Sequence, residues 1–122
     1  MDKATFLELV AEVLEGLPDD IRAMMDNVEV VVEDWASAEE LLQAGVDSRY
    51  NLLGLYHGIP LTQRSSHYGM VLPDKITLYQ RAIELHSGPG GSLRRRIRQT
   101  ILHELAHHFG IDDDRLHEIG RY

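Results

Sequence analysis

The apolar positions near the start of the chain follow helical spacing. Thr5 is a plausible N-cap, and Glu8 stands three residues later, at the spacing of a capping box. Gly16 and Pro18 then mark an end. The pattern therefore predicts a helix over residues 5–17, whose apolar side consists of Phe6, Leu9, Val10, Val13, Leu14 and Leu17.

A second helical pattern lies in the last third of the chain. Ser92 is a suitable N-cap, and Gly110 is a suitable residue to end the helix in the left-handed conformation. We therefore predict a long helix over residues 93–109. Its apolar side consists of Leu93, Ile97, Ile101 and Leu105, widened by Leu102, Ala106 and Phe109.

Three segments between these helices have the composition or the alternation of β-strands. They are residues 28–34, 52–58 and 75–83, and Gly54 in the second segment would suit a β-bulge. Polar or glycine-rich loops are expected at residues 63–69 and 87–91. Short helices are predicted at residues 18–25, at residues 37–44 before Gly45, and from Asp112 or Asp113 to about Ile119. This order predicts an α+β fold, in which a small mixed sheet packs against helices.

Composition narrows the class of protein. The chain has 122 residues, of which 43% are hydrophobic and 26% are charged, so we expect one globular domain, residues 1–122. It has no cysteine, which excludes disulfides, thiolate zinc ligands and a cysteine nucleophile. The formal net charge of −8 argues against a nucleic-acid-binding surface. No secretory signal or membrane-spanning run is visible, so a cytoplasmic protein without membrane association is expected.

A dense basic run at residues 94–98 contrasts with this acidic balance, because four of its five residues are arginine. The simplest interpretation is a solvated helix face. The alternative is a local contact with an anion or with a carboxylate of a substrate.

His103, Glu104 and His107 form the most specific chemical pattern in the chain. Four residues advance about 400° on an α-helix, so both imidazoles project from one face and can bind one Zn²⁺. Glu104 lies close enough to hold a water molecule without being a ligand itself. This His-Glu-x-x-His spacing is that of zinc metalloproteases, in which an activated water attacks a peptide carbonyl and the glutamate is the general base.

A catalytic zinc site has three protein ligands and one open position, so a third ligand is needed. Gly110 permits a turn after the helix, and Asp113 completes a His-Glu-x-x-His-x-x-Gly-x-x-Asp spacing. Asp112 and Asp114 are alternative third ligands, because a bend that differs by one residue would present a different carboxylate.

Other polar and aromatic residues could line the site. Tyr56, His57, Arg64 and Tyr68 carry groups that could donate a hydrogen bond to an oxyanion. Packing within a strand or loop is the simpler interpretation for each of them. His108 projects about 100° away from the preceding histidine, so we do not expect it to be a ligand.

Several segments resemble the minimal zincin-like family, whose members are small proteins described as zinc metallopeptidases. The family has a Leu-Leu-Gly-Leu-Tyr-x-Gly-x-Pro-Leu-Thr-x-Arg segment, here residues 52–64, and a Pro-Asp-x-Ile-Thr-Leu-Tyr segment, here residues 73–79. The end of its motif is similar to residues 109–116. The extended motif is also similar to the metzincin signature, with Asp113 in place of the usual third histidine.

The resemblance implies a compact zincin core in which His103, His107 and Asp113 hold Zn²⁺. It also implies an edge strand that could align an extended peptide or protein substrate by β-augmentation. A metzincin-type methionine turn is not expected, because the methionines precede the motif. Together these features predict a zinc-dependent metallopeptidase, a hydrolase, with Glu104 as general base. The alternatives are a catalytically silent zincin-fold module that binds metal or peptide, and a saturated structural zinc site.

Overall fold

The computed structural model describes residues 1–58, 73–88 and 92–120, without the side chains of Asp113, Ile119 and Gly120. This part of the chain contains six α-helices, one 3₁₀ turn and a three-stranded sheet. The α-helices are α1 (Lys3–Glu15), α2 (Asp19–Met24), α3 (Ala38–Ala44), α5 (Gln80–Ser87), α6 (Leu93–Phe109) and α7 (Asp113–Gly120). The remaining elements are β1 (Val28–Glu33), the 3₁₀ turn η1 (Arg49–Asn51), β2 (Gly54–His57) and β3 (Asp74–Tyr79). The predicted α+β fold is confirmed.

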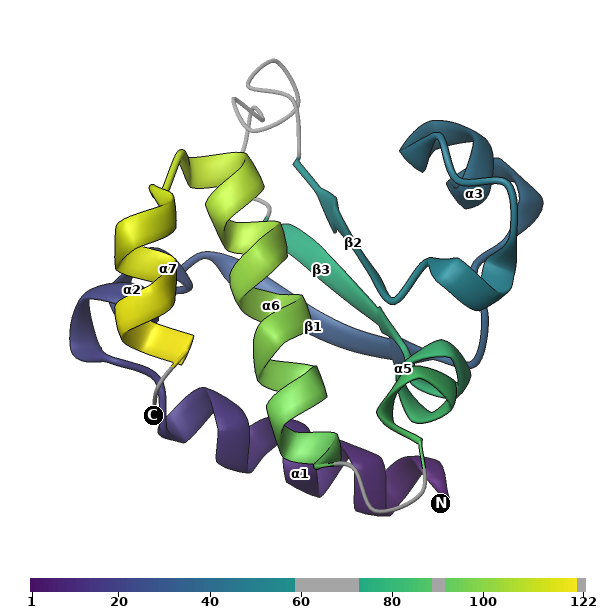
Figure 1. Ribbon diagram of the computed structural model, residues 1–122, viewed down its shortest axis with the longest axis horizontal. Helices are drawn as coiled ribbons and strands as arrows, with labels where there is room; N and C mark the ends of the chain where they lie inside the picture. The colour runs from purple at the N-terminus through teal and green to yellow at the C-terminus, as the bar shows by residue number, and fades with distance from the viewer. Residues whose placement is uncertain (59–72, 89–91, 121–122) are drawn as a thin grey trace, which may run out of the picture.

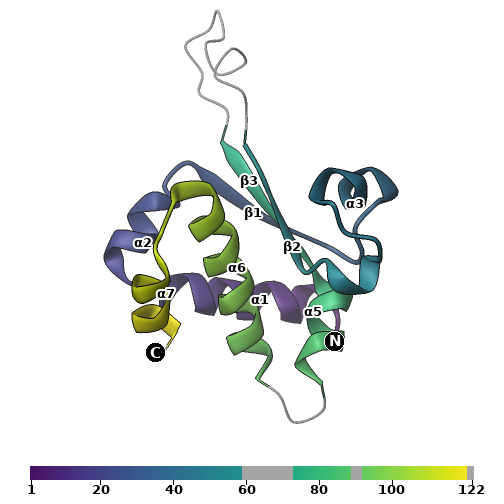
Figure 2. The same cartoon turned by 45° about the horizontal axis from the view of Figure 1, so that its top comes forward.

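The sheet is mixed, as predicted, and has the order β1-β3-β2. The central strand β3 pairs with β1 in parallel and with β2 in antiparallel orientation. Figure 1 shows α6 in front of the strands and α1 below them, and Figure 2 shows the same arrangement after rotation. In both views α3 lies on the far side of β2 from α6. The helix that carries the motif therefore lies next to the edge strand β2.

Two apolar clusters surround the central strand. The larger one joins α1, α6 and the sheet through fully buried side chains, which include Phe6, Ile76, Leu78, Ile97, Ile101 and Leu105. The smaller one lies toward α3 and consists of Ala36, Leu52, Tyr79 and Ala82. Because β3 contributes to both clusters, its side chains are buried on both faces of the sheet, and even the polar Thr77 is fully buried.

The first helix begins two residues before the predicted start. Asp2, and not Thr5, is its N-cap, because Asp2 accepts a hydrogen bond from the backbone N–H of Thr5 over 2.8 Å. Lys3 and Ala4 favour the helical conformation, so the helix extends back to the earlier of two residues that can cap it. The predicted capping box of Thr5 and Glu8 was therefore wrong.

The third predicted strand, residues 75–83, was too long at its C-terminal end. β3 ends at Tyr79 and the chain continues directly into α5. Residues 76–80 are all buried, so the alternation of apolar and polar residues in the sequence does not correspond to an alternation of burial. From there Gln80 and Ile83 are buried at helical spacing, so tertiary packing favours the helix.

Gly54 is not at a bulge. It pairs in regular register with Leu78 at the start of β2. A Cβ atom at this position would lie 2.7 Å from Thr100 Cγ2 of α6. Glycine is therefore required by the close approach of the helix to the strand.

The remaining helix boundaries agree with the predictions. Ser37 and Glu40 form a complete capping box at α3, and Gly45 ends that helix in the left-handed conformation. Ser92 caps α6 and Gly110 follows it with a φ of 69°. The expected loop at residues 63–69 and most of the one at residues 87–91 lie outside the described residues. No helix in the described ranges is long and apolar enough to cross a membrane.

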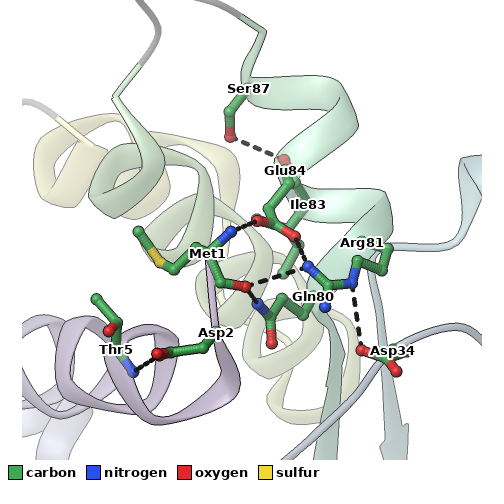
Figure 3. A network of polar contacts seen from close by, with 9 residues as sticks. All are labelled: Met1, Asp2, Thr5, Asp34, Gln80, Arg81, Ile83, Glu84 and Ser87. Carbon is green, nitrogen blue, oxygen red and sulfur yellow. Dashed lines mark hydrogen bonds and ion pairs between the residues drawn. The ribbon is translucent and has the colours of Figure 1, made fainter.

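Polar contacts join the start of the chain to α5 (Figure 3). The amino group of Met1 lies 3.3 Å from Glu84 Oε2, and the Met1 carbonyl oxygen accepts hydrogen bonds from Gln80 and Arg81. Arg81 also contacts Glu84 and Asp34. These contacts position the first turn of α1 beneath α6, where it completes the larger core.

Candidate metal centre

The motif helix α6 separates its apolar and polar sides. Ile97, Ile101 and Leu105 are fully buried against the sheet and α1. His103 and His107 are exposed. The histidine pair therefore lies away from the apolar stripe of α6, and both imidazoles are accessible from one face of the helix.

Glu104 lies between the two histidines in sequence and is half-buried. Its Oε1 atom accepts a hydrogen bond from the backbone N–H of Tyr56 over 2.9 Å. Burial raises the pKa of Glu104 above its usual value, although the Tyr56 amide and the neighbouring His107 and His103 act in the opposite direction. A carboxylate with a raised pKa is suited to accept and return a proton near neutral pH.

The edge strand β2 and the helix α6 run side by side in the same direction. Gly54 lies against Thr100, and Tyr56 binds Glu104 four helix residues further on. Gly58, just after the strand, lies against His108: a Cβ atom added at Gly58 would lie 3.4 Å from Cε1 of His108. Two strand residues span about 6.6 Å and four helix residues span about 6 Å. Contacts therefore recur at every second residue of β2 and every fourth residue of α6.

His108 packs against Tyr56 of β2. Its ring stacks on Tyr56 with 3.9 Å between the ring centroids. The Tyr56 hydroxyl donates to Asp74 Oδ2 over 2.6 Å, and His108 Nε2 lies 3.7 Å from the same oxygen. These contacts hold β2 against the C-terminal half of α6.

Of the other candidate cleft residues, His57 is turned away from α6. It alternates with Tyr56 along β2, so its side chain points to the opposite side, and its Nε2 atom lies 3.7 Å from Glu40 Oε2 of α3. Arg64 and Tyr68 lie outside the described residues. Tyr56 is therefore the candidate that the described part of the structure places beside the motif.

The aspartates after Gly110 differ in their surroundings. Asp112 accepts a hydrogen bond from the backbone N–H of Arg115 over 2.8 Å, so it caps the first turn of α7. Asp114 is exposed. Asp113 is the first residue of α7, but its side chain is outside the described part of the structure. Among the described side chains, no group of three or more histidines and carboxylates is arranged as a metal site.

A pocket of about 250 Å³ continues from the motif along α6, toward the start of the helix. It lies between residues 51–54 and α6, with His103 and Glu104 at one end and Arg96 at the other. The sequence analysis offered a contact with a substrate carboxylate as the alternative for the whole basic run 94–98, without singling out Arg96. The signal was present, because seven residues separate Arg96 from His103, and this spacing is about two helical turns.

Comparison with known proteins identifies the family. Residues 25–121 match the zincin-like metallopeptidase family. The chain belongs to this family. A solved structure of a conserved hypothetical protein from T. thermophilus is similar to this zincin-like chain, with 26% sequence identity and a TM-score of 0.54. The similarity covers 89% of this chain and 94% of the other. No curated protein matches the sequence.

Proposed function

We propose that this zincin-like protein is a zinc-dependent metallopeptidase that hydrolyses peptide bonds. One observation carries the proposal: a half-buried carboxylate, Glu104, lies beside two exposed imidazoles one helical turn apart, next to an edge strand. A merely structural pair of histidines would not need a half-buried carboxylate between them. The membership of the family supports the same reaction class.

The donor set fits zinc. His103 and His107 offer two neutral imidazole nitrogens, the commonest protein ligands of a catalytic zinc, from an exposed helix face. We assign Asp113 as the third ligand, since Asp112 is engaged in capping α7. When bound, zinc would make a water molecule more acidic and stabilise the negative charge that develops on the carbonyl oxygen.

Glu104 would act as general base. Its backbone-anchored Oε1 atom fixes the direction of the carboxylate, and its raised pKa matches the task of taking a proton from water and passing it to the leaving amine. Tyr56 is a positioning residue in this scheme, because its amide holds Glu104 and its ring holds β2 against α6.

The edge strand β2 would hold the peptide. In the sheet order β1-β3-β2 it pairs with β3 on one side, and among the described residues no strand pairs with its other edge, where the Tyr56 amide is bonded to Glu104 and the remaining backbone groups are the ones that a peptide would use. An extended peptide that adds to this edge would bring its carbonyl groups past Glu104.

The proposal is tested with the zinc-loaded protein and its Glu104→Gln variant. Both should contain one zinc by elemental analysis, and both should bind a peptide mixture. The wild type should cleave the peptides, and the variant should be slower by at least about 100-fold. Equal cleavage by both proteins would refute the role of Glu104, and zinc binding with no cleavage would indicate a silent binding module.

The third ligand is tested by comparing Asp113→Ala with Asp112→Ala and Asp114→Ala. Loss of the third ligand should weaken zinc binding by at least about tenfold in Asp113→Ala. Asp112→Ala should lower stability through the lost cap but leave zinc affinity nearly unchanged. The largest loss of affinity in either neighbour would reassign the ligand.

A further inference from the structure

The pocket beside the motif ends at a positive charge. Arg96 is partly buried, and among the described residues its guanidinium Nη2 atom makes one long polar contact, 3.4 Å from the carbonyl oxygen of His86. None of the ion pairs formed by the described residues includes Arg96. Arg94, by contrast, is neutralised by Glu12 over 2.6 Å. Within these parts of the chain Arg96 therefore presents an uncompensated charge, in a protein whose net charge is −8.

A second pocket of about 330 Å³ adjoins the first at Arg96 and Gln99. Arg95 also lines it, together with Ser87 and Ser92, and Arg95 forms no ion pair within the described residues. Guanidinium, amide and hydroxyl donors thus lie together where the two pockets adjoin, at the end of the first pocket that is farther from Glu104. A carboxylate is the common peptide group that such donors bind most strongly.

The distance from the motif matches a short stretch of peptide. Seven residues of helix between Arg96 and His103 span about 10.5 Å and rotate by about 700°, so both side chains leave nearly the same face. An extended peptide covers this distance in about three residues. A peptide cleaved beside Glu104 would therefore place its second to fourth residue from the cleaved bond near Arg96.

We propose that Arg96 and its pocket select peptides that carry a carboxylate two to four residues from the cleaved bond. This inference rests on the proposed peptidase function and specifies its substrate class. The carboxylate can belong to an Asp or Glu side chain or to the C-terminus of a short peptide, and both present the same chemistry to the guanidinium group. The acidic net charge of the protein makes this local preference more distinctive, because the rest of the surface repels such peptides.

The test uses zinc-loaded protein and peptides of equal length that differ at one position. Glu, Gln or Lys is placed two, three or four residues from the cleaved bond, on either side, and a further pair ends in a free carboxylate or an amide. If the carboxylate belongs to a side chain, kcat/KM should be about tenfold or more higher for the Glu peptide than for the Gln peptide at one position. If it belongs to the C-terminus, the same ratio should separate the peptide with a free carboxylate from its amide. Which pair responds identifies the source of the carboxylate.

Three variants assign the preference to a residue. Arg96→Gln should reduce the ratio to below about twofold, and Arg96→Glu should reverse it in favour of Lys. Arg98→Gln is the matched control, because Arg98 belongs to the same helix and lines neither pocket. It should keep the preference. Unfolding curves should show that all three variants fold.

Two outcomes would overturn the inference: cleavage without preference for a carboxylate, or a preference that persists in Arg96→Gln. Either result leaves the peptidase itself intact. Binding of the same peptides to zinc-loaded Glu104→Gln, followed by fluorescence anisotropy, separates the two proposals. A preference that depends on Arg96 there, without cleavage by the wild type, would support the carboxylate pocket and refute the peptidase.

Discussion

The backbone N–H of Tyr56 donates a hydrogen bond to Glu104 Oε1 over 2.9 Å, which joins residues 48 positions apart in the chain. The donor is on an edge strand and the acceptor is on the motif helix, so the contact fixes the carboxylate relative to the strand. A donor on the backbone cannot be removed by side-chain variation, which makes this orientation insensitive to most substitutions at Tyr56.

This contact predicts how two substitutions of Glu104 differ in stability. Gln at position 104 can still accept the Tyr56 hydrogen bond and carries no charge that opposes burial, so Glu104→Gln should be at least as stable as the wild type. Ala at this position leaves the amide without its partner, and Glu104→Ala should lose about 1 kcal/mol. Urea denaturation of both variants at pH 7 measures the difference. A lower stability for Gln than for Ala would contradict the role of the hydrogen bond.

Removal of zinc should lower the melting temperature without unfolding the protein. The buried residues Ile97, Ile101 and Leu105 hold α6 to the core on the side opposite the histidines. Binding at 100 times the dissociation constant stabilises a fold by about 2.7 kcal/mol, and a chelator should remove only this contribution. Circular dichroism melts with and without chelator measure it, and His103→Ala should show no shift. Loss of helical signal on chelation would indicate a structural zinc site.

The close approach of α6 to β2 predicts an unusual sensitivity at Gly54. A Cβ atom there meets Thr100 Cγ2 at 2.7 Å, so Gly54→Ala should cost about 1–3 kcal/mol. Thr100→Ser removes the methyl group and keeps the hydroxyl that donates to the Arg96 carbonyl oxygen. The double variant should therefore recover much of the loss. Gly58→Ala, with its 3.4 Å contact, is the control and should cost less.

Glu40 predicts a pH dependence of stability. Burial acts to raise the pKa of Glu40, but hydrogen bonds from the Ser37 amide and the Tyr79 hydroxyl outweigh it, so the pKa falls below its ordinary value of 4.5. A lowered pKa in the folded state stabilises the protein above pH 4.5, and the contribution is lost as the pH falls through the folded-state value.

We therefore expect Glu40→Gln to lose about 1–2 kcal/mol at pH 7 and progressively less below about pH 4. Glu39→Gln is the matched control, because Glu39 is exposed in the same first turn of α3. It should have little effect at any pH. Denaturation between pH 3 and 7 measures both, and a constant difference for Glu40→Gln would exclude the proposed titration.

Gly110 ends the motif helix at a φ of 69°, which disfavours residues with a Cβ atom. Gly110→Ala should cost about 1–2 kcal/mol and should also weaken zinc binding, since the turn leads toward Asp113. Gly16 follows α1 at an ordinary φ of −85°, so Gly16→Ala should be neutral or slightly stabilising. Equal effects at the two positions in thermal melts would argue against strain at Gly110.

The sequence predicted the elements whose signals are local. Ser92, the apolar stripe and Gly110 define α6 by capping and periodicity alone, and the motif follows from spacing within that helix. Two predicted boundaries were wrong: the end of β3 depends on tertiary packing, and the start of α1 depends on which of two residues caps the helix. Gln80 and Tyr79 are buried next to each other, which an alternating sequence pattern does not predict. The N-cap of α1 is Asp2 and not Thr5.

The partners of the motif were harder to predict than the motif itself. The contact of Tyr56 with Glu104 and that of Asp74 with Tyr56 depend on how β2 packs against α6, and no short pattern encodes such distances. His57 illustrates the difficulty, because one step along β2 turns its side chain toward α3. The basic run 94–98 was predicted as a possible carboxylate contact, and the spacing of two helical turns from His103 could have singled out Arg96 within it.

The two sides of α6 have separate consequences for how this protein can change over evolutionary time. The apolar side determines whether the chain folds, whereas the exposed histidine side contributes little to the core. Substitutions at positions 103 and 107 therefore fall where selection for stability is weak. The proposed metal site could therefore change its ligands while the sheet and the apolar side of α6 stay as they are.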